Sequence, residues 1–161
     1  MLPIPLSDTA ISQLIGAAKS IPEGLSLPLR PMIERNGHWQ KGFEIDGDPG
    51  NRFVVKIRQS CVNTMNFSVI LGYMLPGSYT VFRLRRYNGK SHYHTNVLEN
   101  ERFYDFHVHV ATERYQRPGY NEEHFAERTD RYWNLESAIR CLLDECGFGS
   151  PLSGTSLFRN I

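Results

Sequence analysis

Residues 52–87 read RFVVKIRQSCVNTMNFSVILGYMLPGSYTVFRLRRY. Three runs in this stretch, 52–60, 66–75 and 78–87, alternate apolar with polar side chains or are rich in β-branched and aromatic residues, which is typical of strands. A Pro-Gly turn separates the last two runs, and so short a connection joins antiparallel neighbours, because parallel strands need a crossover of about a dozen residues or more. The stretch therefore predicts the centre of an antiparallel meander.

Two more runs of this kind, 39–45 and 104–113, flank the centre, and a helix is predicted near each end of the chain. Ser7 or Asp8 can cap the first helix, 7–19, and Asn134 can cap the second, 134–146, which Gly147 ends. We predict one α+β domain over 1–146, in which a four- to five-stranded antiparallel meander is packed by the N-terminal and the C-terminal helix. Residues 147–161 are predicted to be a flexible or docking tail.

The composition is that of one globular domain. The chain has 161 residues, of which 40% are hydrophobic, enough for a single buried core. No stretch approaches the roughly 20 apolar residues of a membrane-spanning helix, and the first residues lack the basic and apolar regions of a signal peptide. We therefore expect no membrane association and a cytoplasmic location. Three cysteines, few and odd in number, fit reduced thiols better than a disulfide framework.

The net charge of +1 conceals an uneven distribution of charge along the chain. Residues 52–90 contain no Asp or Glu, whereas their basic residues are Arg52, Lys56, Arg58, Arg83, Arg85, Arg86 and Lys90. In the predicted strands, apolar residues take every second position and leave the charged residues on the other side. We expect this open face to gather Lys56, Arg58, Arg83, Arg85, Tyr87, His107 and His109, with Asp105 and Glu113 as counter-charges.

Four of the six histidines form two pairs of identical spacing, His92 with His94 and His107 with His109. Two residues is the repeat of a strand, so both imidazoles of an extended pair point to the same side. We interpret the first pair as part of a solvated loop and centre the candidate site on the second. Imidazoles gathered on a strand can bind a metal, transfer protons or face water.

Metal binding is one hypothesis for the second pair. His107 and His109, followed by Glu113, repeat the His-x-His-x-x-x-Glu arrangement with which cupins hold zinc, manganese or iron. A cupin would carry a glycine six residues before the first histidine, where this chain has Glu101, and a second motif downstream, where this chain has a predicted helix. We therefore exclude the cupin fold and keep a site for a divalent metal as an alternative.

Phosphoryl-transfer chemistry without a metal or other cofactor is the second hypothesis. His107 and His109 would act as catalytic base and acid, with Glu113 orienting an imidazole. Phosphate groups would bind to Lys56, Arg58, Arg83 and Arg85, and a base would stack on Tyr87 or Tyr104. A non-catalytic interaction or adaptor module explains a charged face equally well.

Residues 80–146 carry a family resemblance. They combine an Arg-rich strand, the loop 91–96 with a His-x-Asn element, a His-x-His strand and an aromatic, Arg and Glu cluster after it. In this they resemble an uncharacterised family of small bacterial proteins associated with mobile elements and toxin–antitoxin loci. The resemblance implies a toxin-like or nucleic-acid-related role, with RNA or a nucleotide as ligand and a protein partner such as an antitoxin.

Together these patterns predict a toxin-like protein that acts on RNA or nucleotide phosphates through its His and Arg face, as a metal-independent ribonuclease or phosphoesterase. The alternatives are a His-x-His metal-dependent enzyme and a non-catalytic interaction protein. The sequence does not specify the substrate or the oligomeric state.

Overall fold

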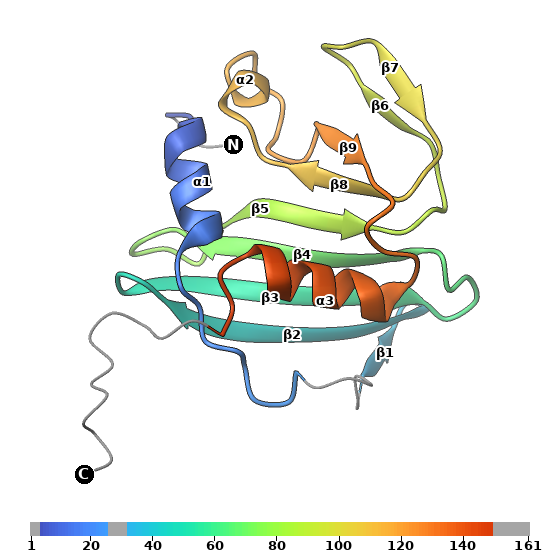
Figure 1. Ribbon diagram of the computed structural model, residues 1–161, viewed down its shortest axis with the longest axis horizontal. Helices are drawn as coiled ribbons and strands as arrows, with labels where there is room; N and C mark the ends of the chain where they lie inside the picture. The colour runs from blue at the N-terminus through green and yellow to red at the C-terminus, as the bar shows by residue number, and fades with distance from the viewer. Residues whose placement is uncertain (1–3, 26–31, 150–161) are drawn as a thin grey trace.

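Seven strands form one antiparallel sheet in the order β1-β2-β3-β4-β5-β8-β9 (Figure 1). The computed structural model describes residues 4–25 and 32–149. The strands of this sheet are β1 Ile33–Arg35, β2 His38–Gly47, β3 Asn51–Ser60, β4 Phe67–Met74, β5 Val81–Asn88, β8 His107–Val110 and β9 Ala126–Arg128. A hairpin of β6, His94–Asn96, and β7, Glu101–Phe103, forms a separate two-stranded sheet between β5 and β8 in the chain.

The α+β class and the antiparallel meander are confirmed, but the predicted number of four to five strands is wrong. The five predicted strands correspond to β2, β3, β4, β5 and β8. The two added strands, β1 and β9, are edge strands of three residues each, too short for an alternating pattern to be recognised. None of the helices in the described part of the chain combines the length and apolar character that a membrane span requires.

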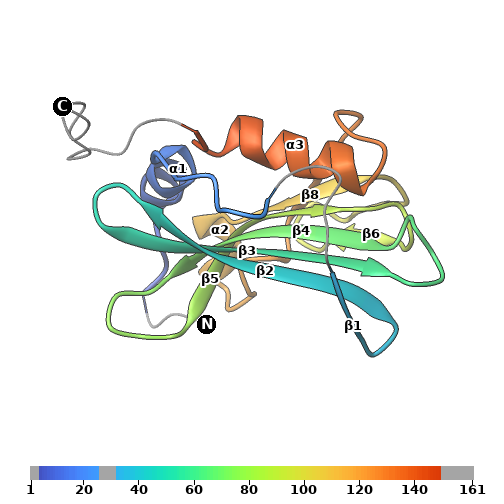
Figure 2. The ribbon, with the colours of Figure 1, turned by 90° about the horizontal axis from the view of Figure 1, so that it is seen from below.

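Two helices, α1 Asp8–Gly16 and α3 Leu135–Glu145, lie over the same face of the sheet (Figure 2). Ser7 caps α1 by accepting a hydrogen bond from the amide of Ala10, and Asn134 caps α3 in a reciprocal capping box with Ser137. The core between helices and sheet contains the fully buried side chains of Phe53, Val55, Leu71, Leu84, Ile139 and Leu142. This face of the sheet is therefore structural.

The C-terminal ends of both helices meet at the buried ammonium group of Lys19. It donates hydrogen bonds of 2.8 Å to the carbonyl groups of Leu14, Ile15 and Ala17, and one of 2.9 Å to that of Cys146. The backbone of Lys19 also pairs with Gly147 and Gly149, so the start of the predicted tail is docked. Residues 150–161 of that tail lie outside the described residues.

A β-bulge in β5 decides which arginines reach the face opposite the helices. Leu71 pairs with Arg85 and its neighbour Gly72 pairs with Arg83, so Leu84 is an extra residue in the ladder. Beyond the bulge the alternation is reversed, and Arg85 and Tyr87 point towards α3, where both contact Glu145. The prediction that Arg85 and Tyr87 lie on the open face is therefore wrong. Arg86 and Asn88 take their place there.

Candidate metal centre

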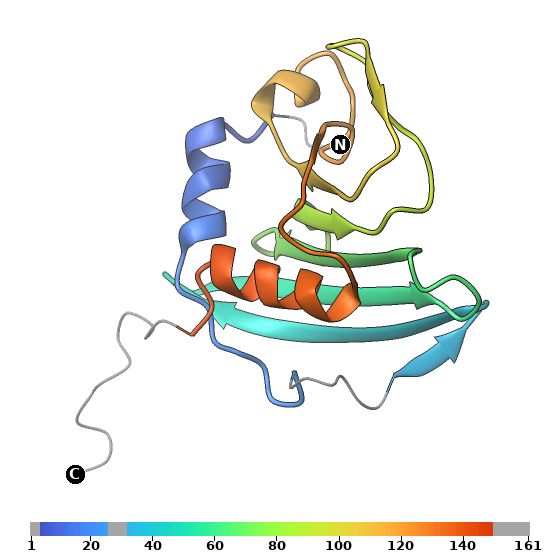
Figure 3. The same ribbon diagram turned by 45° about the vertical axis from the view of Figure 1, so that its right-hand side comes forward.

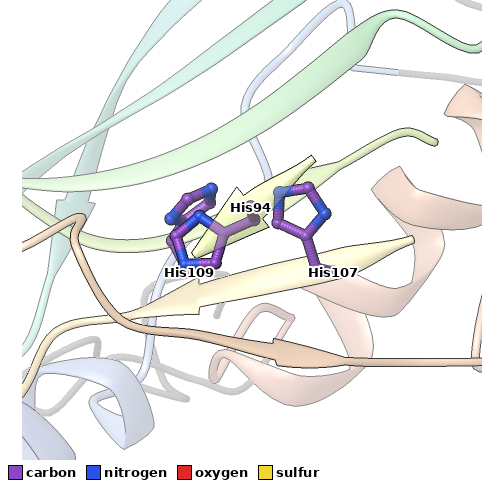
Figure 4. A group of neighbouring side chains, drawn as sticks. All are labelled: His94, His107 and His109. Atoms are coloured by element: carbon purple, nitrogen blue, oxygen red, sulfur yellow. The ribbon is translucent and has the colours of Figure 1, made fainter. Parts of the chain in front are cut away.

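Three histidines from two separate sheets meet at one point (Figure 4). His94 comes from β6, and His107 and His109 come from β8. One ring nitrogen of each lies within 4.8 Å of the others. The ring centroids of His94 and His109, and of His107 and His109, are 4.9 Å apart, and those of His94 and His107 are 5.4 Å apart. Three imidazoles at this separation form a candidate metal centre.

The local folds that bring the rings together follow from strand geometry. His107 and His109 share a side of β8 because they are two positions apart, with only Val108 between them, as the sequence predicts. The β6–β7 hairpin and α2, Glu113–Gln116, gather at the β8 end of the sheet, away from β2 (Figure 3). Phe103 of β7 packs against the rings of both His94 and His107. His107 is fully buried and His109 is 9% exposed, whereas His94 is partly open to solvent.

Backbone carbonyl groups determine which ring nitrogen of His107 and of His109 carries the proton. The Nδ1 atom of His107 lies 2.8 Å from the carbonyl oxygen of Asp105, and the Nδ1 atom of His109 lies 2.5 Å from that of Glu123. A carbonyl oxygen can only accept a hydrogen bond, so both Nδ1 atoms carry the proton. The two Nε2 atoms are therefore left with lone pairs that can bind a metal.

Asn96 determines which ring nitrogen of His94 carries the proton. Its side chain is oriented by the backbone of Ala126, which donates to Oδ1 at 2.9 Å and accepts from Nδ2 at 2.8 Å. Oδ1 is 2.8 Å from the Nε2 atom of His94 and accepts a hydrogen bond from it. Nε2 therefore carries the proton, and Nδ1 of His94 keeps the lone pair. All three histidines thus have one ring nitrogen held by an acceptor and one available as a ligand.

Asn88 contacts both histidines of β8. Its Nδ2 atom lies 3.4 Å from Nε2 of His107 and 3.3 Å from Nε2 of His109, and an amide NH2 group has two protons to donate. Its Oδ1 accepts a 2.9 Å hydrogen bond from Nε of Arg86. This orientation agrees with lone pairs on both Nε2 atoms.

Burial keeps the β8 pair neutral. Desolvation lowers the pKa of His107 to about 4 and, together with the nearby His107 ring, the pKa of His109 to about 3. The positive charge of Arg86 adds to both effects. Neutral imidazole is the form that binds metal ions, so both side chains are in the required state at neutral pH.

The charge of Arg86 beside the cluster is offset by Glu123. Arg86 Nη1 lies 3.3 Å from Glu123 Oε2, and both groups are largely buried. Arg83 pairs with the same carboxylate at 3.5 Å and with Glu122 at 3.1 Å. The segment between α2 and β9 that supplies these acids therefore lowers the repulsion that a divalent cation would meet.

Glu113 does not join the histidines. Strand β8 ends at Val110, and Thr112 caps the short helix α2, so the chain turns before Glu113 can continue the alternation. The carboxylate of Glu113 pairs with Arg117 at 2.5 Å, and its amide donates to Asp8. The prediction that Glu113 lies beside His107 and His109 is wrong, and His94 is the third member of the group.

The other predicted site residues do not lie together. Lys56 and Arg58 are exposed on the face opposite the helices, as predicted. Tyr87 is fully buried and donates to Glu145, whereas Tyr104 is 41% exposed and packs against Tyr93. Asp105 offers its carbonyl group to His107, and its carboxylate lies 3.8 Å from Arg128.

Sequence reasoning missed His94 as a member of the site, together with Asn88 and Asn96 as its supports. The available signal was the His-x-Asn spacing of His94 and Asn96, which places both side chains on one side of an extended segment. No family model matches the chain, and comparison with curated proteins and with solved structures gave no match either.

Proposed function

We propose that the protein binds a divalent transition-metal ion, zinc in the first instance, through His94, His107 and His109, and acts as a metal-dependent hydrolase. The observation that supports this proposal is the convergence of three imidazoles, each of which has one ring nitrogen held by an acceptor. Metal-binding histidines in proteins characteristically have such an outer partner, which orients the ring and selects the tautomer.

The distances fit after small side-chain rotations. Nitrogen ligands of a tetrahedral zinc ion, at about 2.1 Å from the metal, lie about 3.4 Å from one another. The present limit of 4.8 Å requires the rings to close by about 1.4 Å at most. Asn88, whose amide now bridges His107 and His109, would turn away from their lone pairs as the ion enters.

Three histidines leave a fourth position open, which is the arrangement of catalytic rather than structural zinc sites. A water molecule at that position loses a proton near neutral pH and becomes a nucleophile for hydrolysis. The partial exposure of His94 provides the side from which a substrate can approach.

The geometry favours this function over metal-independent acid–base catalysis by His107 and His109. A catalytic acid or base works best with a pKa near the working pH, whereas burial keeps these two imidazoles neutral down to a pH of about 4. The geometry of this site does not test three other predictions, which stay predictions. They are the toxin-like character, a protein partner such as an antitoxin, and the cytoplasmic location.

Zinc titration of chelator-treated protein by calorimetry tests the proposal. We expect one zinc ion to bind per chain and His94→Gln to weaken binding at least about tenfold, because one of three ligands is lost. The control is His124→Gln, since His124 lies outside the cluster and its Nδ1 atom contacts Asn121. A wild-type protein that does not bind zinc, or equal affinities of wild type and His94→Gln, would refute the proposal.

A further inference from the structure

A hollow of about 500 Å³ lies on the face of the sheet opposite the helices. Besides Lys41, its polar lining residues come from strands β1 to β5 and are Arg35, Gln40, Lys56, Arg58, Ser68 and Arg86. We call these six residues the basic groove. Of the described residues that line the hollow, none is acidic. The groove therefore attracts an anionic ligand.

Rows of paired residues across the sheet connect the basic groove with the histidines of β8. One cross-strand row runs Lys56, Ile70, Arg86, His109, and the next runs Arg58, Ser68, Asn88, His107. Lys56 and His109 are three strand spacings apart, or about 14 Å. The last groove residue, Arg86, donates to Asn88, which contacts both histidines of β8. The groove and the candidate metal centre thus lie on the same face of the sheet and are linked through Arg86 and Asn88.

Most of the groove's positive charge is available to a ligand. Among the described residues, no carboxylate forms an ion pair with Arg35, Lys56 or Arg58. Arg58 contacts the ring of His38 at 3.2 Å instead. Lys56 and Arg58 are exposed, so a ligand reaches them without rearrangement of the core.

We propose that the basic groove holds the phosphodiester backbone of a single-stranded nucleic acid and brings one phosphate group to the metal centre. This inference rests on the proposed function and names its substrate class. The distance of about 14 Å from Lys56 to the histidines favours several successive phosphates over a single one. A charged groove that follows the backbone is the usual way of binding single strands, and a hollow of this volume suits a strand rather than a duplex.

The reaction at the metal centre is hydrolysis of one phosphodiester bond. A metal ion held by the three histidines would supply a water that releases one proton to the solvent; the hydroxide so formed would attack phosphorus, and the bond from phosphorus to the leaving sugar oxygen would break. The leaving oxygen takes up a proton from water, so one water molecule is consumed for each bond cleaved. The basic groove stabilises the charge of the substrate and holds it in position.

Fluorescence anisotropy with chelator-treated protein tests the groove separately from the metal. The probe is a labelled single-stranded RNA of about 10 nucleotides, with DNA of the same sequence, a mononucleotide and inorganic phosphate as competitors. We expect the Lys56→Ala/Arg58→Ala double variant to bind the RNA at least about tenfold more weakly and to reduce the slope of log Kd against log salt by about 1.4. Arg140→Ala, on α3 and so on the other face, is the matched control and should bind as wild type does.

Two results would overturn the inference. One is RNA binding that is absent or is equally strong in the double variant, and the other is a mononucleotide that binds as tightly as the oligonucleotide. Zinc titration of the double variant distinguishes a failure of the basic groove from a failure of the metal site. The zinc affinity of the double variant should equal that of wild type. With zinc added, wild type should cleave the bound strand and His94→Gln should bind it without cleavage; an uncleaved strand in wild type would contradict the hydrolytic step.

Discussion

His94 and His109 lie with their ring centroids 4.9 Å apart and their ring planes at 88°, although they belong to two different sheets. The β6–β7 hairpin must fold against β8 for this contact to form. Each ring has its own anchor, the side chain of Asn96 for His94 and the carbonyl group of Glu123 for His109. The candidate metal centre is therefore a product of tertiary structure rather than of one local motif.

Asn96→Ala should weaken zinc binding by about 10- to 100-fold, because the ring of His94 loses the acceptor that orients it. The measurement is a competitive zinc titration at neutral pH. Asn96 also pairs with the backbone of Ala126, so the thermal midpoint of the metal-free variant is measured alongside. A folded variant with unchanged zinc affinity would show that the outer partner of His94 has no role in binding.

Asn88→Asp should bind zinc at least about tenfold more tightly than wild type, a gain of about 1.4 kcal/mol or more. The amide nitrogen of Asn88 lies 3.3 and 3.4 Å from the two Nε2 atoms, which is close to the spacing between ligands of one zinc ion. A carboxylate oxygen at that position can serve as a fourth ligand. Asn88→Ala, which adds no ligand, is the comparison, and equal affinities of the two variants would contradict the assigned geometry.

The metal-free protein should lose stability as the pH falls from 6.5 towards 4. His107 and His109 have folded-state pKa values of about 4 and about 3, below the ordinary value of 6.5, so the unfolded chain binds more protons in this window. Each residue can lower the free energy of unfolding by about 1.4 kcal/mol per pH unit. Urea unfolding with a chelator present measures this dependence.

His107→Gln separates the contribution of this residue from that of other groups. Glutamine does not titrate, so the dependence of stability on pH between 6.5 and 5 should fall by up to about 1.4 kcal/mol per pH unit. A variant with the full wild-type dependence would show that His107 is not buried in its neutral form.

Lys19→Met should lower the free energy of unfolding by about 3 kcal/mol, because the four carbonyl groups at the ends of α1 and α3 lose their buried donor. Chemical denaturation at neutral pH measures the change. Lys90→Met, at an exposed position, should change stability by less than about 0.5 kcal/mol. A Lys19→Met variant as stable as wild type would mean that water replaces the ammonium group at little cost.

The fold could be predicted where the pattern is local and regular. Alternation over eight to ten residues identified β2 to β5, and the caps Ser7 and Asn134 located both long helices. The edge strands β1 and β9 are too short to show alternation. The bulge at Leu84 could not be foreseen, because Phe82, Arg83 and Leu84 alternate between apolar and charged side chains as in a regular strand.

The site could be predicted in part for the same reason. Strand parity placed His107 and His109 side by side, since that relationship depends on two residues of one strand. His94 enters through the packing of a hairpin on a different sheet, and no local pattern specifies such a contact. The run 104–113 predicts a strand that reaches Glu113, whereas in the structure Thr112 caps a helix that begins at Glu113.

X-ray absorption at the zinc edge, on full-length protein loaded with one zinc ion per chain, identifies the ligand atoms. If His94, His107 and His109 bind the ion, the spectrum contains three imidazole nitrogens at about 2.0–2.1 Å and one further light atom from water, and His94→Gln has one imidazole fewer. Zinc bound by cysteine sulfur, at about 2.3 Å, or a spectrum that is the same in wild type and His94→Gln, would contradict this set of ligands.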